Sequence, residues 1–456
     1  MMPQSDGTGL VRALGVREAI AIVVGGIIGS GIFMSPSIVA REAGAPGLSL
    51  LVWVAAGGLA LCGALCYAEL SAAFPQTGGT YRFLREAYPS PMVAFLFGWA
   101  FFFVDGTGAV ATLATTFGTY AGYFLGHVIP YGVIEIKAAA ISCIAIATVA
   151  NYLGVRSGGH VQNVFTALKV LTLTVLVVSC FALGHGSTTH FVPIVPAGKG
   201  ALDVASGFGT GMVAALFAYA GWSYTSYVAG EIRDPQRTVP RSILIGMAVV
   251  LVIYLSVNVA FLYVLPFKRL ATSSLVAADA TRQALGPAGG GLIAAGVMIS
   301  TFGAINAVTL IYPRLGFAMA RDGYFFAALG RVHPRFHTPG NAILVQGAVA
   351  AAFCIMGSFE QILEYYAFID FLFFSLAVAA VIVLRVRRPT LPRPFRVWGY
   401  PVTPVLFLVV SGWYLVNLFL RRPTESMVGL VIMTVGVPFY FHWRRTRPRD
   451  ATPEAA

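Results

Sequence analysis

Residues 25–33, GGIIGSGIF, interrupt an apolar stretch with four glycines and one serine. Gly29, Ser30 and Gly31 are consecutive and cannot share one helix face, and three weak helix formers in a row favour an unwound segment. A helix break leaves unpaired N–H groups on one half and unpaired carbonyl groups on the other. The N–H end favours an anion and the carbonyl end favours a cation. The pattern predicts a binding site made of bare backbone.

A second stretch of this kind, FAYAGWS at residues 217–223, has Gly221 between aromatic residues. The two stretches lie in the first and sixth apolar segments, which open two successive blocks of five. Interrupted helices at matching positions of two halves are typical of inverted-repeat transporters with a site at mid-membrane. The repeat rests on this correspondence, because the halves show no residue-level similarity. One cavity with both kinds of helix end fits an α-amino acid, which carries both charges on one carbon.

Twelve apolar segments must position these breaks. Of the 456 residues, 57% are hydrophobic and 11% are charged, and the mean hydropathy is +0.79. A membrane-spanning helix needs about 20 apolar residues. We expect spans at residues 17–41, 46–73, 91–123, 129–151, 159–183, 204–230, 241–265, 289–320, 341–357, 362–384, 402–420 and 425–443. The sequence therefore predicts an all-α polytopic membrane protein with no separate soluble domain.

The net charge of +12 follows the membrane topology. With the N-terminus inside, the segments on the inner side carry 21 Lys and Arg residues and those on the outer side carry 8. The positive-inside rule then places both termini in the cytoplasm. We expect a multi-pass protein of the cell membrane, the inner membrane if the source is bacterial, and no nucleic-acid partner.

No other chemistry stands out. The five cysteines all fall within predicted spans, without metal-ligand spacing or an exposed pair. The seven histidines lie mostly at loops or span ends, so neither a catalytic group nor a repeated polar channel filter is visible. We expect no enzyme activity, cofactor or metal.

Four ordered motifs carry a resemblance. They are GIIGSGIF, YAELSAAFPQTGGTYRFLREAYP, FAYAGWSYTSYVAGEIRDPQRTVPRSI and NAVTLIYPRLGFAMARDGYFFAALGRVHPRFHTPGNAI. Together they resemble the amino acid–polyamine–organocation superfamily, and within it the L-type amino acid transporter family, over roughly residues 14–400. The resemblance implies the LeuT fold, in which ten core helices form two inverted five-helix repeats with helices 1 and 6 broken, plus two trailing helices.

The resemblance also implies a division of the chain and a set of site residues. The division is a tail at 1–15, a core at 16–400 with repeats at 16–183 and 204–384, peripheral helices at 401–443 and a tail at 444–456. Ser30 and Gly31 would offer N–H groups to the substrate carboxylate. The substrate ammonium and the pocket wall would involve Ile27, Phe217, Ala220 and Trp222. Ile27, Phe217 and Ala220 would act through their carbonyl groups, and the Phe217 ring would also form an aromatic gate.

Two departures from the family pattern qualify the expected substrate and partners. Ala220 stands where the family often has glycine, and its methyl group mildly favours smaller substrate side chains. Eukaryotic light chains of the family carry a cysteine between spans three and four that links to a heavy chain, and this loop has none. We therefore expect a carrier of small to medium neutral L-amino acids without a disulfide-linked partner. Exchange and facilitated or proton-linked transport stay open.

Asp105, in FFFVDGTGA of the third span, lies deep enough that its burial demands a function or a partner. It could bind a cationic substrate, carry a coupling proton or pair with a structural donor. The first option makes a cationic amino acid or polyamine transporter the alternative function. Asp370 in the tenth span is a weaker case, and Glu69 and Glu231 lie near predicted cytoplasmic helix ends.

Lys169 lies ten residues from the predicted start of the fifth span, roughly 15 Å along a helix. That depth is too great for its side chain to reach water, unless the helix begins later than drawn and the lysine sits at the interface. In the family's fold, a lysine at the matching position stands where sodium-coupled relatives hold a sodium ion. The resemblance thus implies sodium-independent transport, with the ammonium group bridging to carbonyls at the first break.

Overall fold

The computed structural model describes residue 12 and residues 14–76, 78–153, 158–336, 338–357, 359–421 and 423–446. Most of both predicted tails lies outside the described residues. Over the described ranges the chain is helical, and its single β contact is an isolated parallel bridge between Leu14 and Ile232. This matches the predicted all-α class.

The chain order begins with the helices of the first five spans, whose bounds are α1 Val16–Ile27, α2 Gly31–Ala43, α3 Pro46–Ala73, α4 Gly79–Ala87, α5 Pro91–Ala100, η1 Phe101–Asp105, α6 Gly106–Leu125, α7 Val133–Tyr152 and α8 Gly158–Ala182. It continues through the sixth to tenth spans with η2 Thr188–Phe191, α9 Ala201–Tyr219, α10 Tyr224–Tyr227, η3 Ala229–Glu231, α11 Pro235–Val264, α12 Phe267–Thr272, α13 Val276–Arg321, η4 Ala327–Gly330, α14 Gly340–Met356 and α15 Phe359–Arg387. The last two helices are α16 Val402–Arg421 and α17 Pro423–Thr446.

Each of the twelve predicted spans coincides with one or more of these helices. Eleven helical stretches of the described residues are long and apolar enough to cross a membrane. The twelfth, Gly340–Met356, is apolar but shorter, and it coincides with the ninth predicted span. The polytopic membrane architecture is therefore confirmed.

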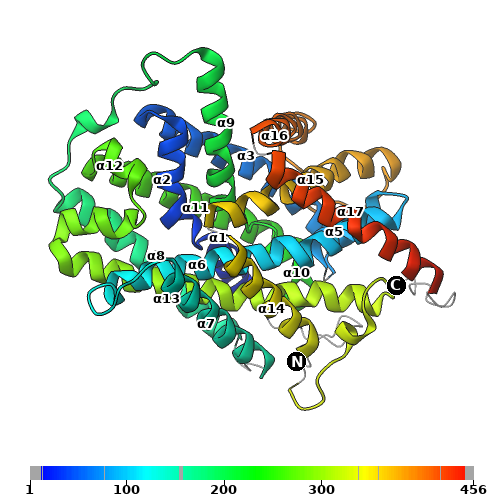
Figure 1. Ribbon diagram of the computed structural model, residues 1–456. Coiled ribbons are helices and arrows are strands. Elements are labelled where there is room, and N and C mark those ends of the chain that lie inside the picture. Colours follow the sequence, from blue (N-terminus) through cyan, green and yellow to red (C-terminus); the bar gives the residue numbers. More distant parts are fainter. Residues whose placement is uncertain are drawn as a thin grey trace.

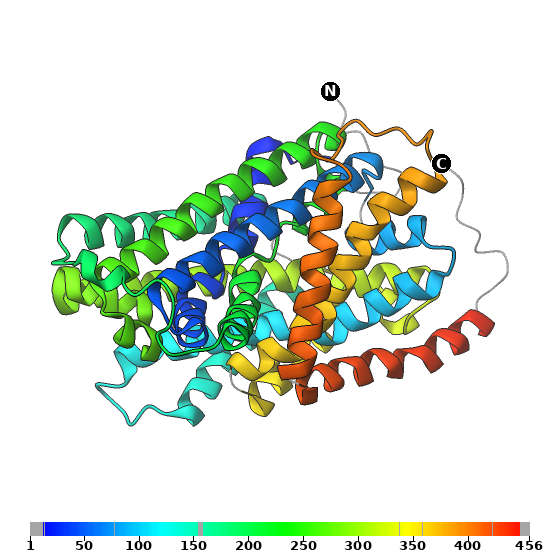
Figure 2. The same ribbon diagram turned by 90° about the horizontal axis from the view of Figure 1, so that it is seen from above.

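The helices form two packed groups (Figure 1). In one group α3 packs on α11 and α9, α1 on α11, and α2 on α9. In the other group α6, α7, α13 and α14 pack on one another. Helix α8 contacts α1, α11 and α13, and α15 contacts α3 and α6, so these two helices join the groups. Helix α16 packs on α15, α3 and α9. Figure 2 shows α17, coloured red, at one edge of the bundle.

Both predicted breaks are present. Residues 28–30 separate α1 from α2, and residues 220–223 separate α9 from α10. At the first break the N–H group of Gly29 turns back to the Ile27 carbonyl at 2.8 Å, which ends the regular helix. At the second, Gly221 has φ +118°, a conformation that favours glycine. Glycine at position 221 therefore shapes the backbone directly.

Two helices differ from the predicted spans in their detail. The third span changes to π-helical hydrogen bonding over η1, and Asp105 ends that turn. The eighth span is the end of a 46-residue helix that begins at Val276, with a kink at Gly286 where φ is +73°. The prediction at 289–320 missed the first part because the kink and Pro287 interrupt the apolar pattern.

Candidate functional site

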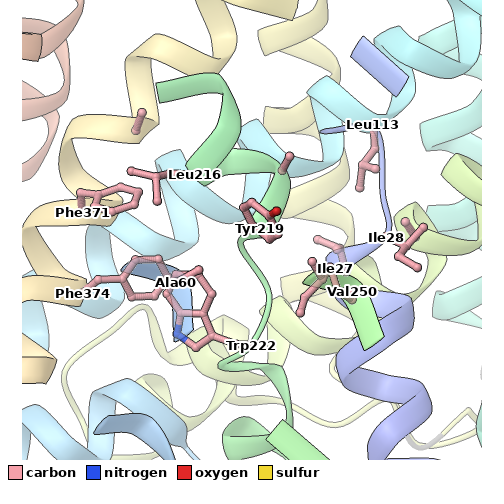
Figure 3. Close-up of a cluster of buried hydrophobic side chains, with 14 of the residues drawn as sticks. Ile27, Ile28, Ala60, Leu113, Leu216, Tyr219, Trp222, Val250, Phe371 and Phe374 are labelled. Carbon is pink, nitrogen blue, oxygen red and sulfur yellow. The ribbon is translucent and has the colours of Figure 1, made fainter. Parts of the chain in front are cut away.

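The two breaks touch each other at the centre of the bundle. A methyl group on Gly221 would lie 3.0 Å from the carbonyl carbon and oxygen of Gly26. One on Gly26 would clash with the Tyr224 ring, and one on Gly31 with the backbone of Ala218. Figure 3 shows the non-helical segment between Tyr219 and Trp222 running beside Ile27 and Ile28. The glycines thus allow two broken helices to approach at backbone distance.

The first turn of α2 carries unused hydrogen-bond donors. Among the described residues, the N–H groups of Ser30, Gly31 and Ile32 have no acceptor, as expected at a helix N-terminus. The Ser30 side chain is 1% exposed, and its hydroxyl also lacks a partner there. A buried hydroxyl without a partner costs about 1–3 kcal/mol. These donors can bind an anionic group.

Unused carbonyl groups lie at the C-terminal ends of α1 and α9, the helices that precede the two breaks. Within the described ranges the carbonyl oxygens of Gly26, Ala218, Tyr219 and Ala220 accept no hydrogen bond. Gly26 and Ala220 are partly exposed although they lie centrally. These acceptors can bind an ammonium group, so the two breaks together offer both halves of a zwitterion site.

Three side chains donate hydrogen bonds to carbonyl groups of α1. Lys169 Nζ donates to the Gly25 carbonyl at 2.7 Å, and Thr166 Oγ1 donates to the Ala21 carbonyl at 3.1 Å. Tyr254 on α11 donates through its hydroxyl to the Ile27 carbonyl at 2.9 Å. Helix α8 begins at Gly158, close to the predicted start, and Lys169 is fully buried within the bundle.

The structure gives the predicted carbonyl acceptors unequal roles. The Ile27 oxygen already accepts from Tyr254 and from the Gly29 N–H group. The Phe217 oxygen accepts from the Ala220 N–H group at 3.0 Å. Only Ala220 of the three predicted acceptors is unbonded among the described residues. Sequence reasoning missed Tyr254, because nothing in a tyrosine of an apolar span indicates a carbonyl 227 positions away in the chain.

The two predicted aromatic residues point to different places. The half-buried Phe217 ring meets Phe359 of α15 edge to face, with centroids 5.9 Å apart. Trp222 is fully buried against Phe374 of α15, at 5.1 Å, and against α3. In Figure 3 the Trp222 ring lies beside Phe374 and Ala60 and away from Ile27. Phe217 therefore lies at the edge of the second break. Trp222 belongs to the break, but its ring packs against α15 and α3.

Asp105 lies in a cluster of tyrosines that includes Tyr224, the first residue of α10. It is 5% exposed, and its carboxyl group interacts with the Tyr312 hydroxyl. Tyr312 shares a hydrogen bond of 3.1 Å with the Tyr224 hydroxyl on α10. The carboxyl group of Asp370 on α15 is close enough for the two acids to interact. No described basic residue forms an ion pair with either acid, so a cation or proton could be held here.

Glu69 forms a buried ionic network at the end of α3. Its carboxylate accepts from Arg385 Nε at 2.9 Å and from the Val397 N–H group at 2.7 Å, with Arg393 Nε at 3.5 Å. Glu69 is 2% exposed, and the Arg385 guanidinium stacks over the Tyr400 ring at 3.8 Å. This network holds α3 to α15 and the segment that follows α15.

A second polar contact holds α4 to the end of α13. Arg85 Nη1 and the Tyr81 hydroxyl both donate to Asp322 Oδ2, at 2.7 and 3.1 Å. Burial, with the Asp322 charge beside it, raises the pKa of Tyr81. The phenol therefore stays protonated and remains a donor at neutral pH.

The described residues contain no group of three or more His, Cys, Asp or Glu side chains that could hold a metal ion. The five cysteines are all free. The candidate site is a set of backbone groups at two helix breaks, with Lys169 and Tyr254 bonded to α1 and Phe217 beside the second break.

Comparison with known proteins gives matches over nearly the whole chain. Residues 14–439 match the family model of the amino acid permeases. The human b(0,+)-type amino acid transporter 1 is 35% identical over 95% of this chain and 88% of its own length. The human Asc-type amino acid transporter 1 is 32% identical over 96% and 84%. The serine/threonine exchanger SteT of Bacillus subtilis is 30% identical over 97% and 99%.

Proposed function

The chain belongs to the amino acid permease family, and from that premise we propose that it exchanges small to medium neutral L-amino acids across a cell membrane without sodium. The observation that carries this proposal is the junction of the two breaks. Unused N–H groups on α2 and unused carbonyl groups on α1 and α9 lie where Gly221 meets Gly26. A zwitterion can satisfy both sets at once.

In this proposal the substrate carboxylate binds the N–H groups of Ser30 and Gly31 together with the Ser30 hydroxyl. The Ala220 carbonyl receives the ammonium group, and Gly26 joins it because its oxygen has no donor among the described residues. Ile27 and Phe217 contribute through oxygens that already accept hydrogen bonds. Each charge-assisted hydrogen bond is worth about 1.5–3 kcal/mol.

The side-chain preference rests on the walls of the site. The Ala220 methyl group and the Phe217–Phe359 pair would form an apolar wall, which favours substrates with neutral side chains. One relative is named a serine/threonine exchanger, in keeping with small side chains. Trp222 fixes the second break by packing on Phe374. Phe217 would close the site on the side of Phe359 once substrate is bound.

Lys169 supports sodium independence. Its ammonium group already contacts a carbonyl of α1 at 2.7 Å, so a positive charge is present where the carbonyl end of the break needs one. A metal ion is then unnecessary for holding α1 to α8. The same contact lets a change in Lys169 alter the position of the first break.

The remaining features of the proposal concern the membrane. The charge bias favours both termini in the cytoplasm. In this orientation Glu69 and Arg385 would lie on the cytoplasmic side and the Phe217–Phe359 pair toward the outside. Residues 16–183 and 204–384 would be the two repeats. Since the loop between α6 and α7 has no cysteine, we expect no disulfide-linked heavy chain.

The test is counterflow into proteoliposomes loaded with one unlabelled amino acid, with a competition panel of the twenty amino acids in sodium-free buffer. Competition by small and medium neutral amino acids is expected. If none of the twenty amino acids, loaded inside the vesicles, drives uptake of a labelled one, the proposal is contradicted.

Asp105 supports a second candidate, transport of cationic amino acids or polyamines, because it is buried beside Asp370 without a described basic partner. Asp105→Asn separates the two candidates. Selective loss of arginine and lysine from the panel would favour the second candidate. An even loss across all substrates would assign Asp105 to a proton or to packing.

A further inference from the structure

The third span packs on α13 through three close contacts. They pair Gly98 with Met319, Phe102 with Gly316, and Gly106 with Tyr312. The two glycines of the third span are eight residues apart (98 to 106), whereas their partners on α13 are seven apart (312 to 319). An α-helix turns about 100° per residue, so eight residues would leave Gly106 pointing about 80° away from the direction of Gly98.

The π-turn η1 lies between these two glycines and removes the mismatch. A π-turn closes its hydrogen bond one residue later than an α-turn, and here the Gly106 N–H group bonds to the Phe101 carbonyl. One residue is thereby absorbed, and both glycines face α13. The wide turn therefore sets which residues of the third span meet α13.

The same turn surrounds Tyr312. The Phe101 ring packs on the Tyr312 ring with centroids 4.5 Å apart, and Gly106 leaves room for that ring, since a methyl group there would lie 2.9 Å from it. The Asp105 carboxyl group, at the end of the turn, interacts with the Tyr312 hydroxyl. Tyr312 is 3% exposed. The turn thus fixes both the ring and the hydroxyl of this tyrosine.

The hydroxyl groups form an ordered chain. A tyrosine hydroxyl has one hydrogen to donate. Tyr312 donates it to the Asp105 carboxylate, so its oxygen accepts from the Tyr224 hydroxyl in the 3.1 Å hydrogen bond between the two tyrosines. Tyr224 begins α10, directly after the second break. Asp105 therefore holds the start of α10 through one intermediate side chain.

The Tyr224 ring in turn borders the peptide of Gly26. A methyl group on Gly26 would clash with this ring, and Gly221 lies against the Gly26 carbonyl group from the second break. The Gly26 oxygen accepts no hydrogen bond within the described ranges, and we assign it to the substrate ammonium group above. A shift of Tyr224 would move one of the two groups that fix this peptide.

We propose that Asp105 is a positioning residue for the ammonium end of the substrate site, acting through Tyr312 and Tyr224 on the Gly26 peptide, and that the π-turn brings Asp105 and Gly106 to Tyr312. The role requires an acceptor oxygen at position 105 and no charge. It differs from the second candidate function, in which the carboxylate would contact a cationic substrate. The inference rests on the proposed function, because it refines how that site binds its substrate.

Two substitutions at position 105 separate the acceptor from the charge. Asp105→Asn keeps an acceptor oxygen for the Tyr312 hydroxyl, and Asp105→Leu removes it at similar size. We expect competition by L-serine to stay within about twofold of the parent in the first variant and to weaken about tenfold in the second, the worth of one hydrogen bond. Thermal unfolding in detergent identifies the folded fraction. An equal loss in both folded variants would overturn the proposal.

The hydroxyl chain is tested without changing any ring. Tyr312→Phe and Tyr224→Phe each break the chain, and the control Tyr123→Phe removes a hydroxyl that donates to the Pro287 carbonyl on an exposed part of the chain. Because both chain variants break the same connection, the double variant is expected to behave like either single one. Additive losses would contradict a shared chain.

A selectivity ratio distinguishes positioning from a general loss of structure. L-serine is compared with 3-hydroxypropanoate, which lacks the ammonium group, and with L-serine amide, which lacks the carboxylate. The chain variants are expected to lower the first ratio of affinities by about three- to tenfold and to leave the second ratio unchanged. An equal fall in both ratios, or no fall in the first, would contradict the proposal.

Deletion of one residue tests the π-turn itself. Without Val104 the third span can continue as a regular α-helix with Gly98 and Gly106 both facing α13, so we expect the variant to fold. Deletion of Ala114, in the regular part of α6, rotates the rest of the helix by about 100° and is expected to prevent folding. Equal damage from the two deletions would show that the turn absorbs no residue. Absence of counterflow by the unmodified chain would instead contradict the proposed function.

Discussion

Gly221 rests directly on the peptide that joins Gly26 to Ile27. A methyl group at Gly221 would lie 3.0 Å from the Gly26 carbonyl and 3.1 Å from the Ile27 nitrogen. With φ +118°, the residue also has a backbone conformation that other residues avoid. The contact brings the two helix breaks, nearly 200 positions apart in the chain, into one site.

Gly221→Ala is expected to abolish exchange and to lower stability. A non-glycine residue in strained backbone costs about 1–3 kcal/mol, and the added methyl group pushes the breaks apart. Gly58→Ala is the matched control, because a methyl group there would meet nothing within 4 Å. Thermal unfolding in detergent and counterflow per folded protein measure both effects. Equal behaviour of the two variants would contradict the assigned contact.

Ser30→Ala is expected to weaken substrate binding without destabilising the fold. The Ser30 hydroxyl is buried and has no partner among the described residues, so its removal costs the folded state nothing. Loss of a hydrogen bond to a charged carboxylate should weaken binding about tenfold. Ser35→Ala is the control, since Ser35 on α2 is also buried with an unpartnered hydroxyl. Substrate affinity is measured by competition. Similar affinities of the two variants would show that the Ser30 hydroxyl does not bind the substrate.

Lys169→Ala is expected to reduce exchange at least tenfold. It removes the donor to the Gly25 carbonyl and leaves that buried group unpaired, at a cost of about 1–3 kcal/mol. The unmodified protein should work equally well in sodium-free and sodium-containing buffer. Thr174→Ala, on the exposed side of the same helix, should have no effect. A strict sodium requirement, or full exchange by Lys169→Ala, would show that the lysine does not replace a sodium ion.

Glu69→Gln is expected to destabilise the protein by about 1–3 kcal/mol, because it leaves the partly buried guanidinium groups of Arg385 and Arg393 without their counter-charge. The control is Glu360→Gln, which removes an ion pair to Arg41 whose side chains are 43% and 46% exposed. Such exposed pairs contribute about 0–1 kcal/mol. Thermal unfolding of both variants measures the difference. Comparable small losses would mean that the Glu69 network does not hold α3 to α15.

The spans and both breaks could be predicted from the sequence because their signals are local. Apolar runs fix the helices, and Gly29 to Gly31 and the FAYAGWS stretch weaken them at two points. The contacts that complete the site are not local. Tyr254 reaches Ile27, and Arg385 reaches Glu69, over more than 200 positions of chain. Such pairs depend on how helices pack, which no periodic pattern encodes.

The π-helical turn before Asp105 escaped prediction for a related reason. Its residues FFFVD are apolar helix formers with one acid, and nothing in them specifies a wider turn. A methyl group on Gly106 would meet the Tyr312 ring at 2.9 Å, so packing against α13 constrains the backbone there. For Trp222 the motif predicts a residue that lines the pocket. In the structure its ring packs against Phe374 of α15, a contact that the motif does not specify.

The most direct test of the central claim, that the N–H groups at the joined breaks bind the substrate carboxylate, compares three ligands that all carry an amine and differ in the carboxyl group. L-serine, its amide and ethanolamine are tested as competitors of a labelled neutral amino acid in proteoliposomes. The amide keeps the ammonium group but lacks the carboxylate, and ethanolamine lacks the carboxyl group entirely. We expect only L-serine to compete, since the N–H groups of Ser30 and Gly31 need a negative charge. Equal competition by all three would contradict the account.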